Sequence, residues 1–553
     1  MSSAPSSSTP TRNVLDAGFA TALLSVAVLS GYAILAPGAL GLGAADRPAS
    51  VATPLESEDV EPAAYVRSSF AINTAEAATL PFPAAAPRAE TSPPPRPRAR
   101  ELTRAPEVPP LRSPDAPRLA VPPGEPREPW PAVVTGRVLD PERRPVEHAS
   151  IVIDSAERFT GPDGAFRVEA APAGEPLLVK MPGFEKVWLT PRKGPVEVVL
   201  RPQAIKAAYL TYYGVGHGGI RGRVLELSER TELNAVVIDV KGDRGWIVYP
   251  TGVPLALAAG AQGPGTLRRF DALMDEFKAR GLYTIARIVT FKDNVLAHHR
   301  PDWAVIDTRT GQPWIDNEKL AWVDPFREEV WAYNIAIAKE AVARGFDEIQ
   351  FDYVRFPTDG RLSAARYTRP NTRQTRVPAI TGFLAQARRE LGPLGAFIGA
   401  DIFGYTAFND NDTDIGQRIE ELAPHVDYLH PMVYPSGYQR GIPGHANPVR
   451  APYHVVHESV RLIRKRAGPA PMRVRPWLQD FRDYAFDRRV FGPAEVRAQI
   501  DGSDDAGGTG WMLWNPRNAY TEAALRASAR AKAQAGAQAG AQVGAQVGAQ
   551  EAW

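Results

Sequence analysis

Two aspartates in this sequence stand where predicted β-strands end, a position from which a carboxylate can act on a bound molecule. Asp352 lies in EIQFDYVRFP, where it shares one face with Gln350 while the other face is apolar, as the period of two in a strand requires. Asp401 lies in GADIFGY, at the end of the next predicted strand. Hydrolysis of a glycosidic bond needs two carboxyl groups, one protonated to release the leaving oxygen and one ionised as nucleophile or base. Because adjacent strands lie about 4.8 Å apart, we expect this pair to fall within the roughly 5 to 9.5 Å that this chemistry uses.

Other polar and aromatic side chains follow the same pattern, and we predict that they bind the substrate. Cationic groups can position sugar hydroxyls or stabilise an ionised carboxylate, and aromatic faces suit a sugar ring. The predicted substrate-binding residues are Asp239, Lys241, Arg287, Arg355, His430, Tyr434, Trp477, Gln479, Asp480 and Trp514.

Three of these predictions have open alternatives. Asp239 or Asp480 could supply the second carboxylate in place of Asp401. Asp352 could form only a structural ion pair with an arginine, Arg287 or Arg355. His430 could equally be a hydrogen-bonded histidine of the core.

These residues belong to a long stretch, 204–530, in which predicted strands alternate with predicted helices. Eight strand segments occur in it, and the helical segments between them carry apolar residues at three- and four-residue spacing. Eight such units are typical of an α/β fold, the (β/α)8 TIM barrel, whose reactive groups gather at the carboxyl ends of the strands. The sequence therefore predicts that the polar strand ends meet at one rim.

One motif favours a different fold. Gly214, Gly216 and Gly219 form G-x-G-x-x-G after the first predicted strand, and Asp239 ends the next strand, which matches the spacing of a dinucleotide-binding fingerprint. The first strand, however, ends in the polar run TYY, which is unusual for a buried central strand of an open sheet. A nicotinamide- or flavin-dependent oxidoreductase is therefore kept only as an alternative.

The segment 131–203 reads as a small all-β sandwich. Short alternating runs are separated by Pro, Gly and Asp, and the turn at Pro162–Gly164 predicts a hairpin. The segment also resembles the carboxypeptidase regulatory-like domain in Gly136, Asp140 and the D-G-x-F run that ends at Phe166. The resemblance implies a spacing or binding module without chemistry of its own.

The ends of the chain are predicted not to form globular domains. Residues 1–16 are a short tail, 17–45 are uncharged and long enough for a transmembrane or signal segment, and 46–130 form a Pro-rich linker predicted to be disordered. The tail 531–553 is of low complexity.

Composition excludes several classes of protein and site. A formal charge of +2, with acids and bases mixed along 553 residues, gives no basic face for nucleic acid. The absence of cysteine excludes disulfides, thiolate zinc sites and cysteine nucleophiles. The run NDNDTD spaces its acids like a calcium loop, but Ile415 stands where the sharp turn needs glycine. We expect no metal and no cofactor.

Six collinear runs resemble the putative glycosyl hydrolase domain family. They are NAVVIDVKGDRG, YTIARIVTFKD, FDEIQFDYVRFP, GADIFGY, DYLHPMVYPSGY and RPWLQDF, and they span roughly residues 205–525. The resemblance implies a glycosidase-like barrel. By analogy with related barrel glycosidases, it also implies Asp352 as nucleophile or base and Asp401 as acid, although an Asp stands where Glu is more usual for the acid.

The sequence thus predicts a glycoside hydrolase that acts on a polysaccharide or cell-envelope glycan. It would be anchored in the membrane with an extracytoplasmic catalytic domain, or secreted or periplasmic if the N-terminal segment is cleaved. No protein partner is implied. The alternative from another class is a carbohydrate-binding barrel without turnover.

Overall fold

The computed structural model describes residues 133–153, 156–169, 176–190 and 194–528. The predicted N-terminal tail, membrane or signal segment, linker and C-terminal tail lie outside these ranges. Among the helices of the described ranges, none is both long enough and apolar enough to cross a bilayer.

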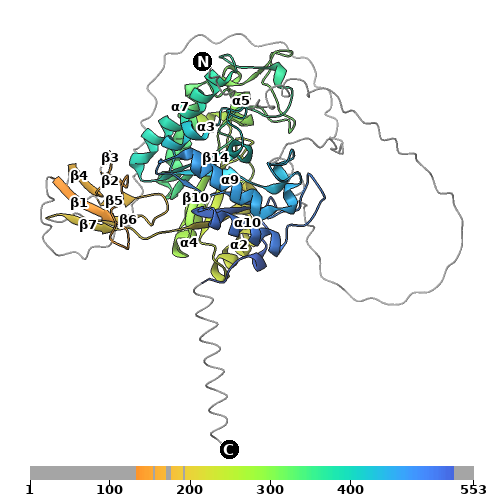
Figure 1. The fold of residues 1–553 in the computed structure, drawn as a ribbon. Coiled ribbons are helices and arrows are strands. Elements are labelled where there is room, and N and C mark those ends of the chain that lie inside the picture. The colour runs from red at the N-terminus through yellow and green to blue at the C-terminus, as the bar shows by residue number, and fades with distance from the viewer. Residues whose placement is uncertain (1–132, 154–155, 170–175, 191–193, 529–553) are drawn as a thin grey trace, which may run out of the picture. The chain divides into compact units, whose positions relative to one another are not determined.

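The first described domain is a small β-sandwich, drawn in orange in Figure 1. One sheet has the order β4-β1-β7 and the other the order β3-β2-β5-β6. Its apolar core includes Val138, Ile151 and Val179, which are fully buried. The strands are β1 (Val133–Leu139), β2 (Ser150–Ile153), β3 (Ala156–Phe159), β4 (Ala165–Glu169), β5 (Leu177–Lys180), β6 (Val187–Leu189) and β7 (Val196–Val199).

Two details of the sandwich differ from the prediction. The turn at Pro162–Gly164 connects β3 to β4, but these strands do not form a hairpin, because β3 pairs with β2 and β4 pairs with β1. The turn residues fix a local reversal, whereas the choice of sheet depends on which faces are buried. In addition, β1 and β7 pair in parallel rather than antiparallel. Membership in the carboxypeptidase regulatory-like family stays a prediction.

The second domain is the predicted closed barrel of eight parallel strands. Around the barrel, the strands follow the order β8, β9, β10, β12, β14, β15, β17 and β18, and β18 pairs with β8 to close the ring. They are β8 (Ile205–Leu210), β9 (Ala235–Lys241), β10 (Tyr283–Val289), β12 (Glu348–Asp352), β14 (Phe397–Phe403), β15 (Tyr428–Met432), β17 (Trp477–Gln479) and β18 (Gly510–Trp514).

The seventh strand is interrupted. The run MRVRPWLQ forms two short pieces, β16 (Arg473–Val474) and β17, that both pair with β15. Pro476 lies between them. Proline has no N–H to donate to the ladder, which explains the break at this position.

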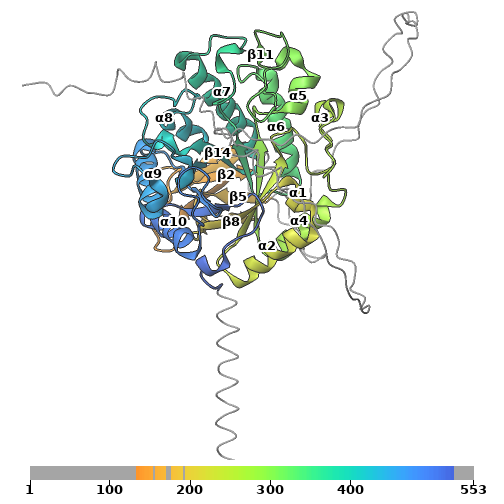
Figure 2. The same cartoon turned by 90° about the vertical axis from the view of Figure 1, so that its right-hand side faces the viewer.

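Helices surround the strands, as Figure 2 shows. The longer ones follow the predicted amphipathic stretches, and two short strands pair in the loops that follow β10 and β12. The helices are α1 (Tyr212–Gly216), α2 (Gly218–Arg230), α3 (Pro254–Ala259), α4 (Phe270–Ala279), α5 (Asn294–His299), α6 (Glu328–Ala343), α7 (Arg373–Leu391), α8 (Ile419–Leu422), α9 (Pro452–Ala467) and α10 (Pro493–Asp505), and the short strands are β11 (Ile306–Asp307) and β13 (Ala365–Arg366).

Alternation along each strand separates two apolar cores. In β9, Val236 and Ile238 pack with the helices, whereas Ala235 and Val237 pack inside the barrel. The next inward position after Val237 is Asp239, so the same period that builds the inner core carries a polar residue toward the carboxyl end of the strand.

Candidate active site

A cavity of about 130 Å³ lies at the carboxyl ends of the barrel strands. It is smaller than the roughly 300–1,000 Å³ of typical ligand pockets, so it would enclose only part of a polymer. Six of the predicted site residues line it, and they come from five different strands or the loops that follow them: Arg287, Asp352, Arg355, Tyr434, Trp477 and Trp514.

Asp352 is the last residue of β12 and is 6% exposed. Its Oδ2 accepts hydrogen bonds from Nε and Nη2 of Arg287, at 3.0 and 2.5 Å. Its Oδ1 accepts a bond of 2.6 Å from the backbone N–H of Tyr353, which has a φ of 47°. A left-handed tyrosine is strained, and strain of this kind is held mainly at functional sites.

Arg287 holds two carboxylates at once. Its Nη1 donates to Asp239 at 2.5 Å, and Asp239 also accepts from the hydroxyl of Tyr209 at 2.5 Å. Asp239 is fully buried and does not line the cavity. The arginine that pairs with Asp352 is therefore Arg287 and not Arg355, and Asp239 lies behind Arg287.

Asp401 lies just beneath the cavity and is 1% exposed. Its Oδ1 accepts hydrogen bonds from Trp477 Nε1 at 2.9 Å and from Gln350 Nε2 at 2.5 Å. Its Oδ2 has no hydrogen-bond partner among the described residues. Burial, and then the charge of nearby Asp352, hold the pKa of Asp401 well above its ordinary value.

The register of the sheet brings these two aspartates to adjacent positions on neighbouring strands. Phe351 of β12 lies opposite Ala400 of β14, so Asp352 and Asp401 are the next pair along the two strands. One carboxyl is paired with a cation and the other is buried among neutral groups. The arrangement favours a protonated carboxyl at Asp401, next to a carboxyl that forms an ion pair with Arg287.

Three predicted substrate-binding residues do not line the cavity. Their polar groups form ion pairs or hydrogen bonds with other residues of the protein. Lys241 is fully buried and paired with Asp293 at 2.7 Å. The amide of Gln479 accepts from the backbone N–H of Ser436 and donates to its hydroxyl, which fixes the loop after β15. Asp480 accepts two bonds from Thr521, and burial raises the pKa of Asp480 to about 6.

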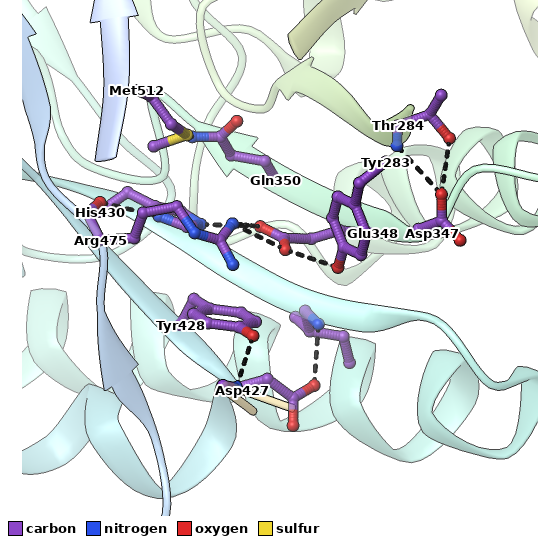
Figure 3. Close-up of polar contacts among 12 residues, drawn as sticks. Tyr283, Thr284, Asp347, Glu348, Gln350, Asp427, Tyr428, His430, Arg475 and Met512 are labelled. Atoms are coloured by element: carbon purple, nitrogen blue, oxygen red, sulfur yellow. Dashed lines mark hydrogen bonds and ion pairs between the residues drawn. The ribbon is translucent and has the colours of Figure 1, made fainter. Parts of the chain in front are cut away.

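His430 also lies away from the cavity, in a buried cluster lower in the barrel that Figure 3 shows. Its Nε2 is 3.0 Å from Glu348 Oε1, and its Nδ1 is 3.1 Å from the carbonyl oxygen of Arg475. Arg475 Nη1 donates to both oxygens of Glu348, at 3.0 and 2.9 Å. The arrangement corresponds to the alternative interpretation of His430 as a hydrogen-bonded core histidine.

Glu348 is the centre of this cluster and also accepts from the hydroxyl of Tyr283 at 3.0 Å. Burial by itself would raise its pKa, but the charge of Arg475 and the hydrogen bond with His430 outweigh that effect and lower the pKa to about 2. Glu348 therefore acts as a buried anion that joins three strands.

Several further residues of the cavity wall are not among the predicted site residues. Asp359 lies in the loop after β12 and lines the cavity, and burial raises its pKa. Tyrosines of three loops also contribute: Tyr405, Tyr438 and Tyr484. Their only sequence signal is a position shortly after a predicted strand, and many loop residues share it.

The dinucleotide and calcium motifs have other roles in this structure. The strands close into a ring, which leaves no crevice of the kind that a dinucleotide occupies in an open sheet, and buried Asp239 is bound by Tyr209 and Arg287. In the NDNDTD run, Asp412 and Asp414 both bond to Arg376.

Comparison with solved structures gives several matches. A hypothetical protein from Ruminiclostridium thermocellum is 36% identical, with 35% of this chain and 96% of that chain covered and a TM-score of 0.31. The PgaB (BpsB) glycoside hydrolase domain from Bordetella bronchiseptica is 14% identical, covering 57% and 95%, with a TM-score of 0.42. A class V chitinase from Pseudomonas fluorescens is 12% identical, covering 58% and 98%, with a TM-score of 0.35.

Comparison with curated proteins gives no match. A family model does match, and it covers residues 207–520, which is more than half of the chain. These residues begin in β8 and continue past β18, so the match spans the whole barrel. The resemblance predicted from the six sequence runs is thereby confirmed, and the chain belongs to the putative glycosyl hydrolase domain family.

Proposed function

We propose that the barrel hydrolyses a glycosidic bond in a polysaccharide or cell-envelope glycan, with Asp352 and Asp401 as the catalytic pair. The observation that carries the proposal is the contrast between these two neighbouring carboxyls. Asp352 forms an ion pair with Arg287 at the cavity wall, and the pKa of Asp401 is raised by burial and by Asp352. Glycosidases separate the charge states of their two carboxyls in this way.

In the proposed reaction, Asp401 gives its proton to the leaving oxygen of the glycosidic bond while that bond breaks. Asp352 either attacks the anomeric carbon, after which a water that gives its proton to Asp401 breaks the new bond and releases the sugar, or takes a proton from a water that attacks directly. Trp477 bonds to Asp401 and, with Trp514, lines the cavity, where the aromatic rings would support the sugar ring.

The test is glycan cleavage by the full chain and two variants, Asp352→Asn and Asp401→Asn, on a panel of bacterial exopolysaccharides and cell-wall glycans. Asp302→Asn is the control, because it removes an exposed carboxylate whose partner is Arg300. Each catalytic variant should lose about 10²–10⁴-fold in rate, while the control stays within about twofold of wild type. If both catalytic variants keep cutting near the wild-type rate, the catalytic assignment is wrong.

The pH profile supplies a second readout. Because the raised pKa of Asp401 keeps its proton on, activity should fall as pH rises through that pKa. Asp401→Asn should remove this alkaline limb together with most of the activity.

A carbohydrate-binding barrel without turnover is the second candidate. It is favoured by the low exposure of Asp401 and by the Arg287 bonds that occupy Asp352 Oδ2. In that case wild type and both Asn variants would bind the same glycan and none would cut it.

The proposal places the catalytic domain outside the cytoplasm, because the glycans of the cell envelope lie there. The segment 17–45 would export the chain or anchor it. Fractionation of cells that express the full chain tests this, because an anchored form stays with the membranes while a cleaved form appears in the soluble fraction without those residues.

A further inference from the structure

Three cationic side chains line the cavity, and two of them already have carboxylate partners. Arg287 pairs with Asp239 and Asp352. Lys292 pairs with Asp316 at 2.9 Å and also with Glu318.

Arg355 is the exception. Among the described residues, no carboxylate oxygen lies within 4.0 Å of its nitrogens, although it is only 7% exposed. Aromatic rings surround its guanidinium, with Cζ 4.5 Å from the ring centre of Phe403, 4.8 Å from that of Tyr353 and 5.2 Å from that of Trp322.

Only Nη1 of Arg355 forms hydrogen bonds with the described residues. Nη1 donates to the carbonyl oxygen of Phe356 at 3.0 Å and contacts Thr358 Oγ1 at 3.4 Å. Nε and Nη2 have no acceptor among the described residues, and neither is among the fully buried atoms that lack one. These two nitrogens are therefore not fully buried, and Arg355 lines the cavity. Adjacent Nε and Nη2 donors form the fork that binds a carboxylate through both of its oxygens.

A cation in such a place is costly without a counter-charge. Burial lowers the pKa of Arg355, although the charges of Asp359 and Asp352 act in the opposite direction. These more distant carboxylates and the aromatic rings therefore offset the cost of burial only in part. If Arg355 served only to brace the loop after β12, the Nη1 bonds would suffice and a neutral donor could make them.

We propose that Arg355 forms a subsite for an acidic group on a sugar of the substrate, a carboxylate or a sulfate, bound through Nε and Nη2. This assignment rests on the proposed function, because it names the class of glycan that the same cavity accepts. Arg355 and Asp352 both line the cavity, so the acidic sugar would lie close to the bond that is cut.

The test is equilibrium binding by the full chain, with released product measured in the same samples. Polygalacturonate and alginate are each compared with the same polymer after its carboxyl groups are reduced to alcohols, and dextran sulfate is compared with dextran. Wild type should bind at least one acidic polymer about 10- to 100-fold more tightly than its neutral partner, as expected for a charge-assisted hydrogen-bonded pair. The carboxylate and sulfate arms tell which acidic group is recognised.

Three variants make the result specific. Arg355→Gln should abolish the preference, and Arg355→Lys should keep only part of it, because an ammonium group lacks the fork. Arg300→Gln is the matched control, since Arg300 also lies over a tryptophan, 3.7 Å from the ring centre of Trp303, but pairs with Asp302 and does not line the cavity. It should leave the preference unchanged.

The proposal is overturned if wild type shows no preference, or if the preference survives in Arg355→Gln. Should that variant fail to fold, an unchanged preference in Arg355→Lys overturns it equally. A preference without cleavage would refute the hydrolase and support the subsite, whereas cleavage of neutral glycans without a preference would refute only the subsite.

Discussion

Replacing Glu348 by Gln tests whether the layer beneath the cavity is a structural ion cluster. The side chain keeps its size but loses its charge, and its new N–H₂ group faces the donors of Arg475. Glu348 is the only carboxylate within 4.0 Å of Arg475 among the described residues, and Nε and Nη2 of Arg475 have no acceptor there. The variant therefore leaves a fully buried guanidinium without a counter-charge.

The expected loss of unfolding free energy follows from the pKa of Glu348. A pKa of about 2 for Glu348, against an ordinary value of about 4.3, corresponds to about 3 kcal/mol of folding free energy at pH 7. Loss of one partner of a buried pair typically costs about 3–5 kcal/mol. We therefore expect the free energy of unfolding to drop by about 3 kcal/mol or more.

The assay is urea unfolding of the full chain followed by tryptophan fluorescence. Because the pKa of Glu348 is lower in the folded than in the unfolded state, its stabilisation is present above about pH 4.3 and is lost as pH falls toward 2. The difference in unfolding free energy between wild type and Glu348→Gln should therefore be constant from pH 7 to 5 and shrink below about pH 4. The control, Asp302→Asn, breaks the exposed pair with Arg300 and should cost no more than about 1 kcal/mol. A difference below about 1 kcal/mol for Glu348→Gln would refute the assignment and reopen the prediction that His430 binds sugar.

Two further predictions concern Gly399 and Asp480, which do not line the cavity. In Gly399→Ala, the new Cβ would lie 2.2 Å from Nε2 of His430, so the thermal midpoint should fall by the equivalent of about 1–3 kcal/mol. The control is Gly222→Ala in α2, where the new Cβ would meet no atom within 4 Å beyond its chain neighbours and the backbone of its own helix. This variant should stabilise the protein by about 0.5–1 kcal/mol. Because the pKa of Asp480 is raised to about 6, the folded state binds its proton more tightly than the unfolded state, and wild-type stability should decline by about 3 kcal/mol between about pH 4 and pH 6. Asp480→Asn should lack this component, and urea midpoints with the same pH dependence in both proteins would contradict the assignment.

The barrel could be predicted from the sequence because each of its strands and helices has a residue pattern that is visible within a short segment. Each strand and each helix carries its own period, and the eight repeats leave little choice of fold. The hairpin at Pro162–Gly164 failed because pairing depends on distant strands, which a turn signature does not describe. The position of Lys241 at a strand end predicts substrate binding, but its partner Asp293 belongs to the loop after another strand, which the local pattern does not describe.

Depth along the barrel axis decides which inward polar residues can meet a ligand. On β12, Glu348, Gln350 and Asp352 all point inward, at intervals of roughly 6.6 Å along the strand. The first lies in the buried ion cluster, the second donates to Asp401, and only the third lines the cavity.

The register of the strands does not by itself predict how deep in the barrel a side chain lies. His430 lies opposite Asp401 in the ladder between β14 and β15, yet it bonds to Glu348 in the lower layer. Strands of a closed barrel are tilted, so partners in a ladder lie at different heights along the axis. Sequence shows which residues end a strand and which face they share, but the tilt of the ring determines whether such a residue reaches the cavity or fills the barrel below it.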